Sequence, residues 1–473
     1  MNSYHRYMRS LLAILLIWGL GGCKDYFELN QNPTLIDNPP LSAFLSTTTQ
    51  KTALNSQRIG NITSYFVQYL ASPGAGGSTD TYQITDYTSA WDAVYFGMAD
   101  LYDMKRKAQE QGASEYVGVA DVLLSYHLTL IADTFGSAPF SDAFTGTTLT
   151  PKYDTAETLY TTALNLLNEA ITELAKTDSK VKLSAANDLI HKGSTAAWTK
   201  TAYALKARML NKISKTSAYK PADVLDATSK SYTANADDAQ MSSFLLRNPW
   251  AQVARNNALL TLDGWLSTQL VNQLNGTTYG VFDPRIEKIT DKTVNNDYKG
   301  TVNGQGNVGG NNTTKDESYI SLNSPLTGDA SPLLIVTFAE MKFVEAEAAL
   351  ASGDKARAYA AYLAGIRANM DKLGVAAEAR DAYIANPLVS VGANALTRDL
   401  IFKEKYVVTY LNPEAWNDAR RYDYQYKGFK LPVNSALPTY IRRVAYPNGE
   451  TTKNGKNVPT EVALSEPLWW DKR

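Results

Sequence analysis

Few side chains in this sequence could carry out covalent or acid–base chemistry on a substrate. Cys23 is the only cysteine, and apart from His5 the only histidines are His127 and His191. The sequence contains none of the motifs Gly-x-Ser-x-Gly, Gly-Lys-Ser/Thr or His-Glu-x-x-His. A disulfide, a cysteine nucleophile and a thiolate metal site are therefore excluded within the chain. We predict no catalytic residue, no metal ligand and no cofactor.

The acidic side chains are numerous but form no recognisable pair. A glycoside hydrolase that uses two carboxylates stays open as an alternative, because residue counts alone do not exclude it. Glu340 and Glu347 lie two turns apart on one predicted helix, an arrangement that we interpret as a solvated helix face. His127 lies on a long apolar helix, and we interpret it as a structural residue.

Aromatic residues are the side chains that stand out for binding. The chain has 29 Tyr and 8 Trp, and several of them lie among Gly, Asn and Thr. A sugar stacks its C–H face on an aromatic ring while amides bind its hydroxyls, and neither contact needs an ionisable group. We predict ligand-binding roles for Tyr82, Trp250, Tyr298 and Tyr319, which occupy such loops. Trp91 lies in a helical pattern and should pack in the core.

The chemistry expected of Cys23 is lipidation. A positively charged start precedes an apolar stretch, residues 11–20, that is too short to cross a bilayer. The segment Leu20-Gly21-Gly22-Cys23 then resembles a bacterial lipobox, in which the cysteine becomes the lipidated mature N-terminus. We predict a signal peptide over residues 1–22 and a lipidated N-terminus and tether over residues 23–42. The mature protein is expected to be anchored by lipid in the cell outer membrane and exposed at the surface.

The charge balance argues against one class of partner. The formal net charge is −1 and the isoelectric point is about 6.4. Sequence-independent binding of nucleic acid depends on a basic surface that neutralises phosphates. We therefore predict no nucleic-acid partner.

One long apolar helix is expected to organise the fold. A thin polar stripe of Asp121, Ser125 and Thr129 interrupts it, which predicts a helix that is wet along one narrow line and packed elsewhere. Ser114 is expected to cap its start, and Gly136 to end it with a positive φ. Asp121 interrupts the helix too strongly for a membrane span. We expect a core helix onto which other helices dock.

Two later helices share an internal pattern. One opens at the capping-box pattern of Asp154 and Glu157 and runs to Lys176, and the other opens at Gly353-Asp354. Both carry the spacing small-x3-large-x2-small-aliphatic, which resembles the second helix of a tetratricopeptide repeat, where small residues let paired helices approach closely. The expected first members of the pairs are residues 118–134 and 333–352, with further helices at 196–214 and 397–410. The matching residues are Ala163, Leu167, Ala170 and Ile171, and Ala358, Tyr362, Gly365 and Ile366.

Two regions have a different composition. Residues 237–332 mix aromatic residues with Asn, Gly and Thr, and residues 430–473 contain several prolines and end close to Trp469-Trp470. Both regions are rich in loops yet too aromatic to be simple linkers. We predict that they pack on the helical half as parts of a single domain over residues 43–473.

Motifs in the last third of the chain carry a family resemblance. The dipeptide Glu404-Lys405, the run Pro413-Glu-Ala-Trp-Asn-Asp-Ala-Arg-Arg421 and Arg443-x-x-Tyr446-Pro447 are similar to the SusD/RagB family of surface lipoproteins. The central Asp133-x-Phe-Gly-x-x-Pro-Phe140 and the mature start Asn30-x-Asn-Pro33 resemble the same family. Together these matches span almost the whole mature chain.

This resemblance implies a mainly α, SusD-like fold in which tetratricopeptide-like helix pairs pack against a loop-rich, ligand-binding half. It also implies a nutrient-binding lipoprotein without catalysis, which captures oligosaccharides and delivers them to a partner SusC-type TonB-dependent outer-membrane transporter. Peptides, as in the RagB branch, are the alternative ligand class; a surface glycoside hydrolase and a helical scaffold are the alternative functions. We interpret the matched Trp416, Arg420 and Arg421 as architectural residues that fix the C-terminal segment by ion pairing and stacking.

Replacing Cys23 tests the predicted anchor. The variant Cys23→Ala should lose lipid labelling and be released from the membrane or misprocessed, because no other cysteine can accept the lipid. Membrane fractionation and metabolic lipid labelling measure both effects. A variant that is still labelled and still sediments with membranes would contradict the lipobox assignment.

Overall fold

Helices make up about half of the described chain, and strands are few. The computed structural model describes residues 38–258, 263–308, 316–460 and 462–472, so the predicted signal peptide, Cys23 and most of the tether lie outside the described residues. Residues 41–473 form one unit, separate from residues 1–40. Its first helix, α2 (Leu41–Phe66), begins slightly before the expected position at residue 43.

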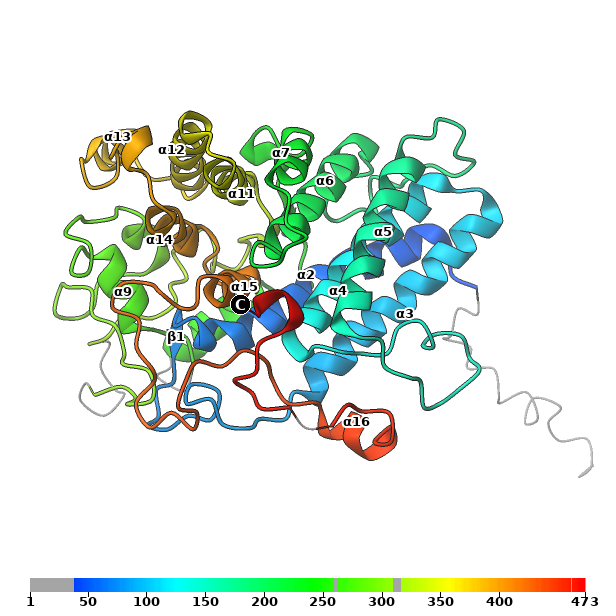
Figure 1. Ribbon diagram of the computed structural model, residues 1–473, viewed down its shortest axis with the longest axis horizontal. Helices are drawn as coiled ribbons and strands as arrows, with labels where there is room; N and C mark the ends of the chain where they lie inside the picture. Colours follow the sequence, from blue (N-terminus) through cyan, green and yellow to red (C-terminus); the bar gives the residue numbers. More distant parts are fainter. Residues whose placement is uncertain (1–37, 259–262, 309–315, 461, 473) are drawn as a thin grey trace, which may run out of the picture. The chain divides into compact units, whose positions relative to one another are not determined.

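The unit is built as a series of helices in which neighbours in the sequence pack on one another. Helix α2 packs on α3, α3 on α4, and so on to α7, after which α11 packs on α7 and on α12. Figure 1 shows α12, α11, α7, α6 and α5 following one another along the upper edge. The first helices of the series are α3 (Thr88–Gln111), α4 (Ser114–Phe135), α5 (Ala156–Leu174), α6 (Thr195–Lys212) and α7 (Pro221–Ser229).

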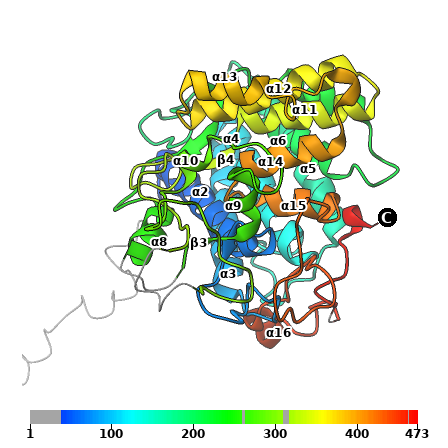
Figure 2. The ribbon, with the colours of Figure 1, turned by 90° about the vertical axis from the view of Figure 1, so that its left-hand side faces the viewer.

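The second half of the chain adds longer helices and a set of short elements. Figure 2 shows α11, α12 and α13 across the top and the short helices α8, α9 and α10 below them. After β4 (Leu333–Val336) come α11 (Phe338–Ala351), α12 (Lys355–Lys372), α13 (Ala377–Ala385), α14 (Arg398–Val408) and α15 (Glu414–Arg421), followed by the short α16 (Asn448–Lys453). The other short helices are α8 (Pro249–Ala258), α9 (Thr268–Leu274) and α10 (Ile286–Ile289).

Strands are few and short, and each described sheet has two. Strand β1 (Leu70–Ala71) pairs antiparallel with β3 (Trp265–Leu266), and β2 (Ala239–Met241) pairs antiparallel with β4 (Leu333–Val336). Each pair joins segments that lie far apart in the sequence. The loop-rich region 237–332 is therefore fastened to the rest of the fold by backbone hydrogen bonds.

Helix α4 is the central core helix that the sequence predicts. It is long and apolar enough to cross a membrane, but 89% of its most apolar window is buried inside the protein, as in a core helix. The expectation of a wet stripe was wrong, because Asp121 and Ser125 are buried. Asp121 pairs with Lys105 of α3 at 2.7 Å, and Lys105 also pairs with Glu169 of α5. Burial raises the pKa of Asp121 to about 7, against the charge of Lys105.

The two predicted helix pairs are confirmed, α4 with α5 and α11 with α12. Their small residues stand where the helices approach most closely. A Cβ on Gly118 would lie 2.5 Å from the Leu174 side chain, and a Cβ on Gly365 would lie 2.5 Å from the Phe343 ring. Because such distances leave no room for a methyl group, glycine permits the close packing in both pairs.

Several predicted helix ends were placed differently. Ser114 is the first residue of α4, and the cap position is Ala113, which has no side chain to cap with. Helix α5 is capped by Thr155, whose side chain accepts from the Thr158 backbone N–H, in place of the expected Asp154. Residues 333–336 form β4, so α11 is shorter than expected and is capped by Thr337. The cap of α12 at Asp354 is confirmed.

Gly136 ends α4 with a φ of 92° and a ψ of −119°, a conformation in which glycine is strongly favoured. We expect Gly136→Val to lower the free energy of unfolding by about 2 kcal/mol or more, because a β-branched residue is strained at this φ. Urea denaturation measures the change. Gly74→Val is the matched control, since Gly74 has no positive φ and a Cβ there meets nothing within 4 Å. Equal midpoints for the two variants would show that Gly136 does not require glycine.

Candidate functional site

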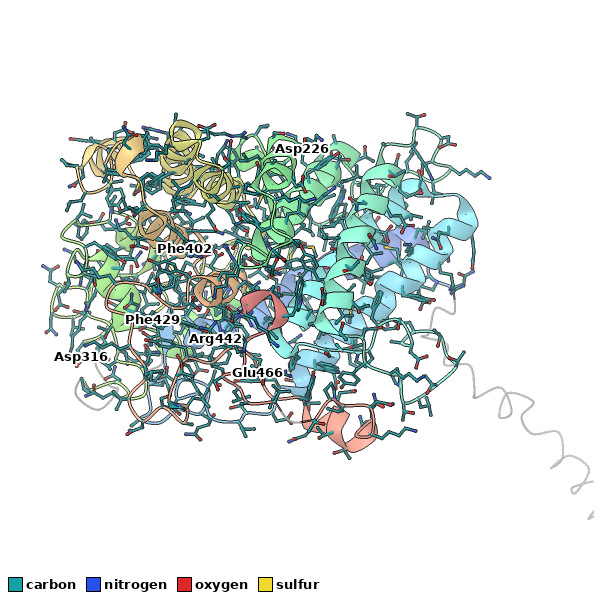
Figure 3. The ribbon with its side chains drawn as sticks, viewed as in Figure 1. Asp226, Asp316, Phe402, Phe429, Arg442 and Glu466 are labelled. Carbon is teal, nitrogen blue, oxygen red and sulfur yellow. The ribbon has the colours of Figure 1, made fainter. Side chains whose placement is uncertain are left out.

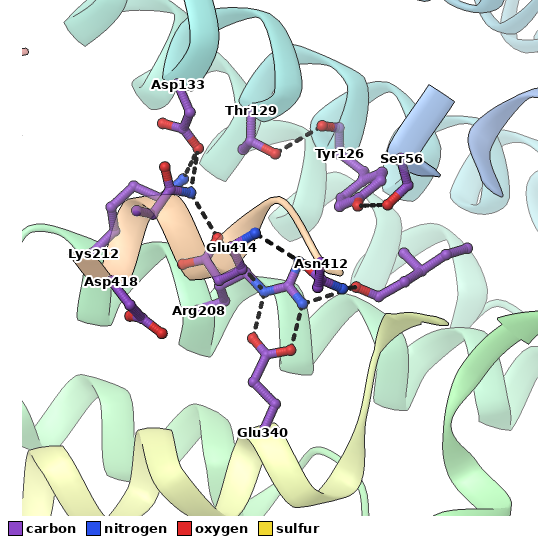
Figure 4. Close-up of polar contacts among 12 residues, drawn as sticks. Ser56, Tyr126, Thr129, Asp133, Arg208, Lys212, Glu340, Asn412, Glu414 and Asp418 are labelled. Atoms are coloured by element: carbon purple, nitrogen blue, oxygen red, sulfur yellow. Dashed lines mark hydrogen bonds and ion pairs between the residues drawn. The ribbon is translucent and has the colours of Figure 1, made fainter. Parts of the chain in front are cut away.

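The most highly charged part of the interior lies where α4, α6, α11 and α15 meet. Arg208 of α6 forms two hydrogen bonds with Glu340 of α11, at 2.7 and 2.6 Å, as Figure 4 shows. Lys212, one turn further along α6, pairs with Asp133 near the end of α4. Asn417 of α15 donates to Asp133 at 2.9 Å. These contacts join four helices by groups that are all buried.

A second set of ion pairs lies beside the first. Lys405 and Arg421 both contact Glu347 and Asp418, at distances of 2.5 to 3.0 Å. Burial alone would raise the pKa of Glu347, but the charges of Arg421 and Lys405 outweigh it and lower the pKa to about 2. The interpretation of Glu340 and Glu347 as a solvated face was wrong, because both are buried against cations.

Of the two arginines in the family motif, Arg420 holds the C-terminal segment, as predicted, whereas Arg421 pairs with Glu347 and Asp418 instead. The guanidinium of Arg420 lies 3.8 Å from the ring centre of Trp416 and 4.8 Å from that of Trp470. Its nitrogens donate to the Asp133 carbonyl and the Arg442 carbonyl, at 2.8 and 2.7 Å. Arg420 therefore connects α15, the end of α4 and the C-terminal segment through one side chain.

The charged side chains of this interior pair with one another and link helices, which is a structural role. Both histidines outside residues 1–37 are internal to the fold, and burial lowers the pKa of His127 and of His191 to about 4. His127 Nδ1 lies 2.8 Å from the Leu123 carbonyl, in agreement with a structural role. Over the part of the chain that the structure describes, no group of three or more His, Cys, Asp or Glu side chains is arranged to hold a metal ion.

Two of the four aromatic residues predicted to bind ligand are buried. Tyr82 is 1% exposed and packs edge-on against Phe66. Trp250 is 3% exposed and lies in the first turn of helix α8, where a loop was expected. Neither ring presents a face to solvent in this structure. Trp91 is also buried and contacts Phe135, as the sequence predicts.

The other two predicted residues, Tyr298 and Tyr319, are half-buried. Tyr298 lies 6.4 Å from the ring of Phe282, which is 46% exposed. Tyr319 pairs through its backbone with Trp265 in the neighbouring strand. Among the described residues, no ring contact joins any two of the four predicted positions. They do not form one aromatic platform.

A groove of about 350 Å³ beside α9 is the candidate ligand site. Uncharged amide and hydroxyl side chains dominate its lining, and none of the lining residues is acidic. Its walls come from four stretches of the chain, and we call it the amide groove. The lining residues are Gln68, Ser267, Thr268, Gln269, Asn272, Thr278, Val302, Asn303, Gly428, Lys430 and Leu431.

Glycines bring the loops around the amide groove together. A Cβ on Gly304 would lie 2.0 Å from the Val433 carbonyl oxygen, and one on Gly306 would lie 2.6 Å from the Ala75 nitrogen. A Cβ on Gly300 would lie 2.5 Å from Thr268. The glycine-rich run therefore serves close packing of backbone on backbone, because any side chain at these positions would push the loops apart.

Asp80 and Asn303 fix the floor of the groove. The Asp80 carboxylate accepts from the Gly304 backbone N–H at 2.7 Å and from the Asn303 amide at 2.5 Å. Burial raises the pKa of Asp80, although these hydrogen bonds favour its charged form. Asn303 also donates to the Leu70 carbonyl at 2.9 Å. Both side chains are thus occupied in holding the loops.

Other polar groups in the groove remain available. Within the described chain, the side chains of Asn272 and Thr278 make no hydrogen bond, and both are half-buried. Apolar side chains lie beside them, with Val302 39% and Leu431 36% exposed. Asn275, one turn after Asn272, donates to the Tyr298 carbonyl at 3.1 Å and so places the Tyr298–Phe282 ring pair next to α9. The arrangement suits a ligand with many hydroxyl groups and apolar faces.

The aromatic pattern of the sequence does not point to this groove, although another signal is present. The run Ser267-Thr-Gln-Leu-Val-Asn-Gln-Leu-Asn275 is a short helix pattern whose polar positions are all uncharged. A solvated helix usually carries Lys or Glu at such positions. The positions of the aromatic residues alone do not reveal these amide side chains. Figure 3 labels Phe402 and Phe429 among the side chains of the protein. Both are buried, which illustrates that many of the aromatic residues serve packing.

Comparison with known proteins identifies relatives. The family model SusD-like, described as starch-binding and associating with the outer membrane, matches residues 32–447. No curated protein matches the chain. A SusD/RagB family protein from Bacteroides thetaiotaomicron is 23% identical, with a TM-score of 0.74 over 92% of this chain and 99% of that chain.

Further solved structures share the fold. A chitin-binding SusD homologue from Flavobacterium johnsoniae is 22% identical, with a TM-score of 0.76 over 90% of this chain and 98% of that chain. A SusD homologue from Bacteroides uniformis is 20% identical, with a TM-score of 0.74 over 92% of this chain and 100% of that chain. These likenesses confirm the predicted mainly α, SusD-like fold.

The ion pairs of Glu347 predict an acid-sensitive contribution to stability. We expect Glu347→Gln to lower the free energy of unfolding by about 3 kcal/mol at neutral pH, because it leaves Arg421 and Lys405 under-compensated. The pKa of Glu347 falls from 4.5 to about 2 on folding, so the wild-type advantage should shrink as the pH falls from 4.5 towards 2. Urea denaturation at several pH values measures both effects. The exposed Glu378→Gln is the control, and an equal loss there would contradict this role.

Proposed function

The chain belongs to the SusD-like family of starch-binding, outer-membrane-associated proteins, and from this premise we propose that it captures oligosaccharides in the amide groove and passes them on without altering them. The observation that carries the proposal is the chemistry of the groove. Its free hydrogen-bonding side chains are those of Asn272, Thr278 and Lys430, its remaining surface is partly apolar, and the partly exposed Tyr298–Phe282 ring pair lies next to α9. Sugar rings offer complementary hydroxyls and C–H faces.

The place of capture is the cell surface. We propose that Cys23 carries the lipid anchor and that the tether leaves the folded unit exposed at the outer membrane. The partner is a SusC-type TonB-dependent transporter, which takes the bound oligosaccharide onward. The lipobox sequence and the outer-membrane association of the family support this assignment.

The protein acts by binding alone. A glycosidase needs two carboxylates placed either side of a bond, about 5 to 10 Å apart, in an open cleft. The lining of the amide groove contains no acidic residue, and the interior carboxylates described above are committed to ion pairs. The chemistry of the site therefore supports recognition of an intact ligand.

Substitutions in the groove test this function. We expect Asn272→Ala to weaken oligosaccharide binding about three- to tenfold, the usual value of one or two net hydrogen bonds. Tyr298→Ala should weaken binding about tenfold if its ring stacks on the ligand. Isothermal titration calorimetry against a panel of glycans and peptides measures the affinities, and chromatography after long incubation shows whether the ligand stays intact.

Controls separate binding from folding. Gln109→Ala, on the exposed face of α3, removes an amide far along the chain from the groove and should leave affinity unchanged. Trp250→Ala and Trp91→Ala should lower stability, because both rings are buried. Cleaved glycan would place the protein among the enzymes, and binding of peptides alone would move the ligand class to peptides. Glycan binding unaffected by Asn272→Ala and Tyr298→Ala would place the site elsewhere.

A further inference from the structure

One wall of the amide groove carries positive charge. Gly428, Lys430 and Leu431 line this wall, and we call the segment Lys427-Gly-Phe-Lys430 the lysine strap. Lys430 lines the groove directly, and Lys427 stands three residues earlier, separated from it by the groove residue Gly428. Both lysines are exposed.

The lysine strap is held in place at the residues that carry the charges. The Gln68 side chain donates to the Lys430 carbonyl at 2.6 Å, and the Gln269 side chain donates to the Lys427 carbonyl at 3.2 Å. Gly428 has a φ of 82°, which turns the chain between the two lysines. Two groove amides thus fix the backbone from which the cations project. Lys427 is further oriented by the Tyr279 ring, whose centre lies 5.7 Å from its Nζ.

No acidic group neutralises these cations from within the groove. Neither Lys427 nor Lys430 forms an ion pair with any described residue, whereas the interior cations Arg208, Lys212 and Arg285 all do. The carboxylate of Asp80, which holds the groove residue Asn303, is buried and occupied by hydrogen bonds from Gly304, Asn303 and Ser72. A groove lined by one sign of charge concentrates ligands of the opposite sign, even on a protein whose net charge is −1.

We propose that the amide groove selects anionic oligosaccharides, whose uronate carboxylates or sulfate esters contact Lys430 and Lys427. Asn272 and Thr278 on the facing wall bind sugar hydroxyls, which leaves the lysine strap as the feature that discriminates charged from neutral chains. This inference rests on the proposed function, because it names the class of sugar for the same groove. It differs from the starch given in the family description and from the chitin of one structural relative, which are both uncharged or nearly so.

The test compares three oligosaccharides of matched length: a neutral malto-oligosaccharide, an oligogalacturonate and a sulfated oligosaccharide. At low salt we expect one of the two acidic chains to bind about tenfold more tightly than the neutral chain, a difference of about 1.4 kcal/mol. Raising the ionic strength from about 0.01 M to about 1 M shortens the Debye length from about 30 Å to about 3 Å and should remove most of this preference.

Lysine variants identify the source of the preference. Lys430→Gln and Lys427→Gln should each weaken acidic binding about three- to fivefold and leave neutral binding unchanged, since a single exposed charge contributes modestly. Lys355→Gln is the matched control, an exposed lysine at the start of α12 that forms no ion pair in the described structure. Asn272→Ala should weaken neutral and acidic chains alike.

The outcomes separate this inference from the function beneath it. Equal binding of acidic and neutral chains, with both weakened by Asn272→Ala, would overturn charge selection and leave oligosaccharide capture in place. An acidic preference that survives in Lys430→Gln and Lys427→Gln would also overturn it. Failure of every oligosaccharide to bind would remove the proposed function and this inference together. Binding of acidic peptides alone would move the ligand class to peptides and refute the assignment to sugars.

Discussion

Buried ion pairs between helices far apart in the sequence determine how the helices of this protein pack on one another. Arg208 and Lys212 of α6, Glu340 of α11 and Asp133 of α4 must all lose their hydration when the helices pack. Each of these charges can be buried only with its partner beside it, because an unpaired buried charge is strongly unfavourable. Such pairs add less net stability than their number suggests. They specify one arrangement of the helices, and the loops that form the amide groove pack on these helices.

Features that depend on neighbours in the sequence were predictable, and features that depend on distant contacts were not. Helix α4 and the close pairing at Gly365 follow from apolar periodicity and from small residues, so the sequence indicated both. The roles of Trp416 and Arg420 followed from a family motif. Glu340 and Glu347 were misread as solvated, because their cations come from α6, α14 and α15, and no local pattern reveals such partners.

The candidate ligand site also depends on contacts between residues that are distant in the sequence. Tyr82 lies in polar, glycine-containing sequence and Trp250 follows Asn248-Pro249, yet tertiary packing buries both rings. The groove takes Gln68 from just after α2, several residues from α9 and its flanks, two from a glycine-rich loop and three from the stretch 428–431. Only the tertiary structure brings these four stretches together. The uncharged polar face of α9 was the local sequence feature that indicated the candidate site.

The way Gly304 meets Val433 has a consequence for how such a protein changes over evolutionary time. The frame of the groove is set by main-chain atoms in contact with main-chain atoms, with glycine at the crossing points. Side chains such as Asn272, Thr278 and Lys430 stand on this frame without supporting it. Replacing them would change the chemistry of the groove surface at little cost to folding, so single substitutions can vary it independently of the fold. Replacing one of the glycines instead would push the loops apart and so disrupt the groove itself.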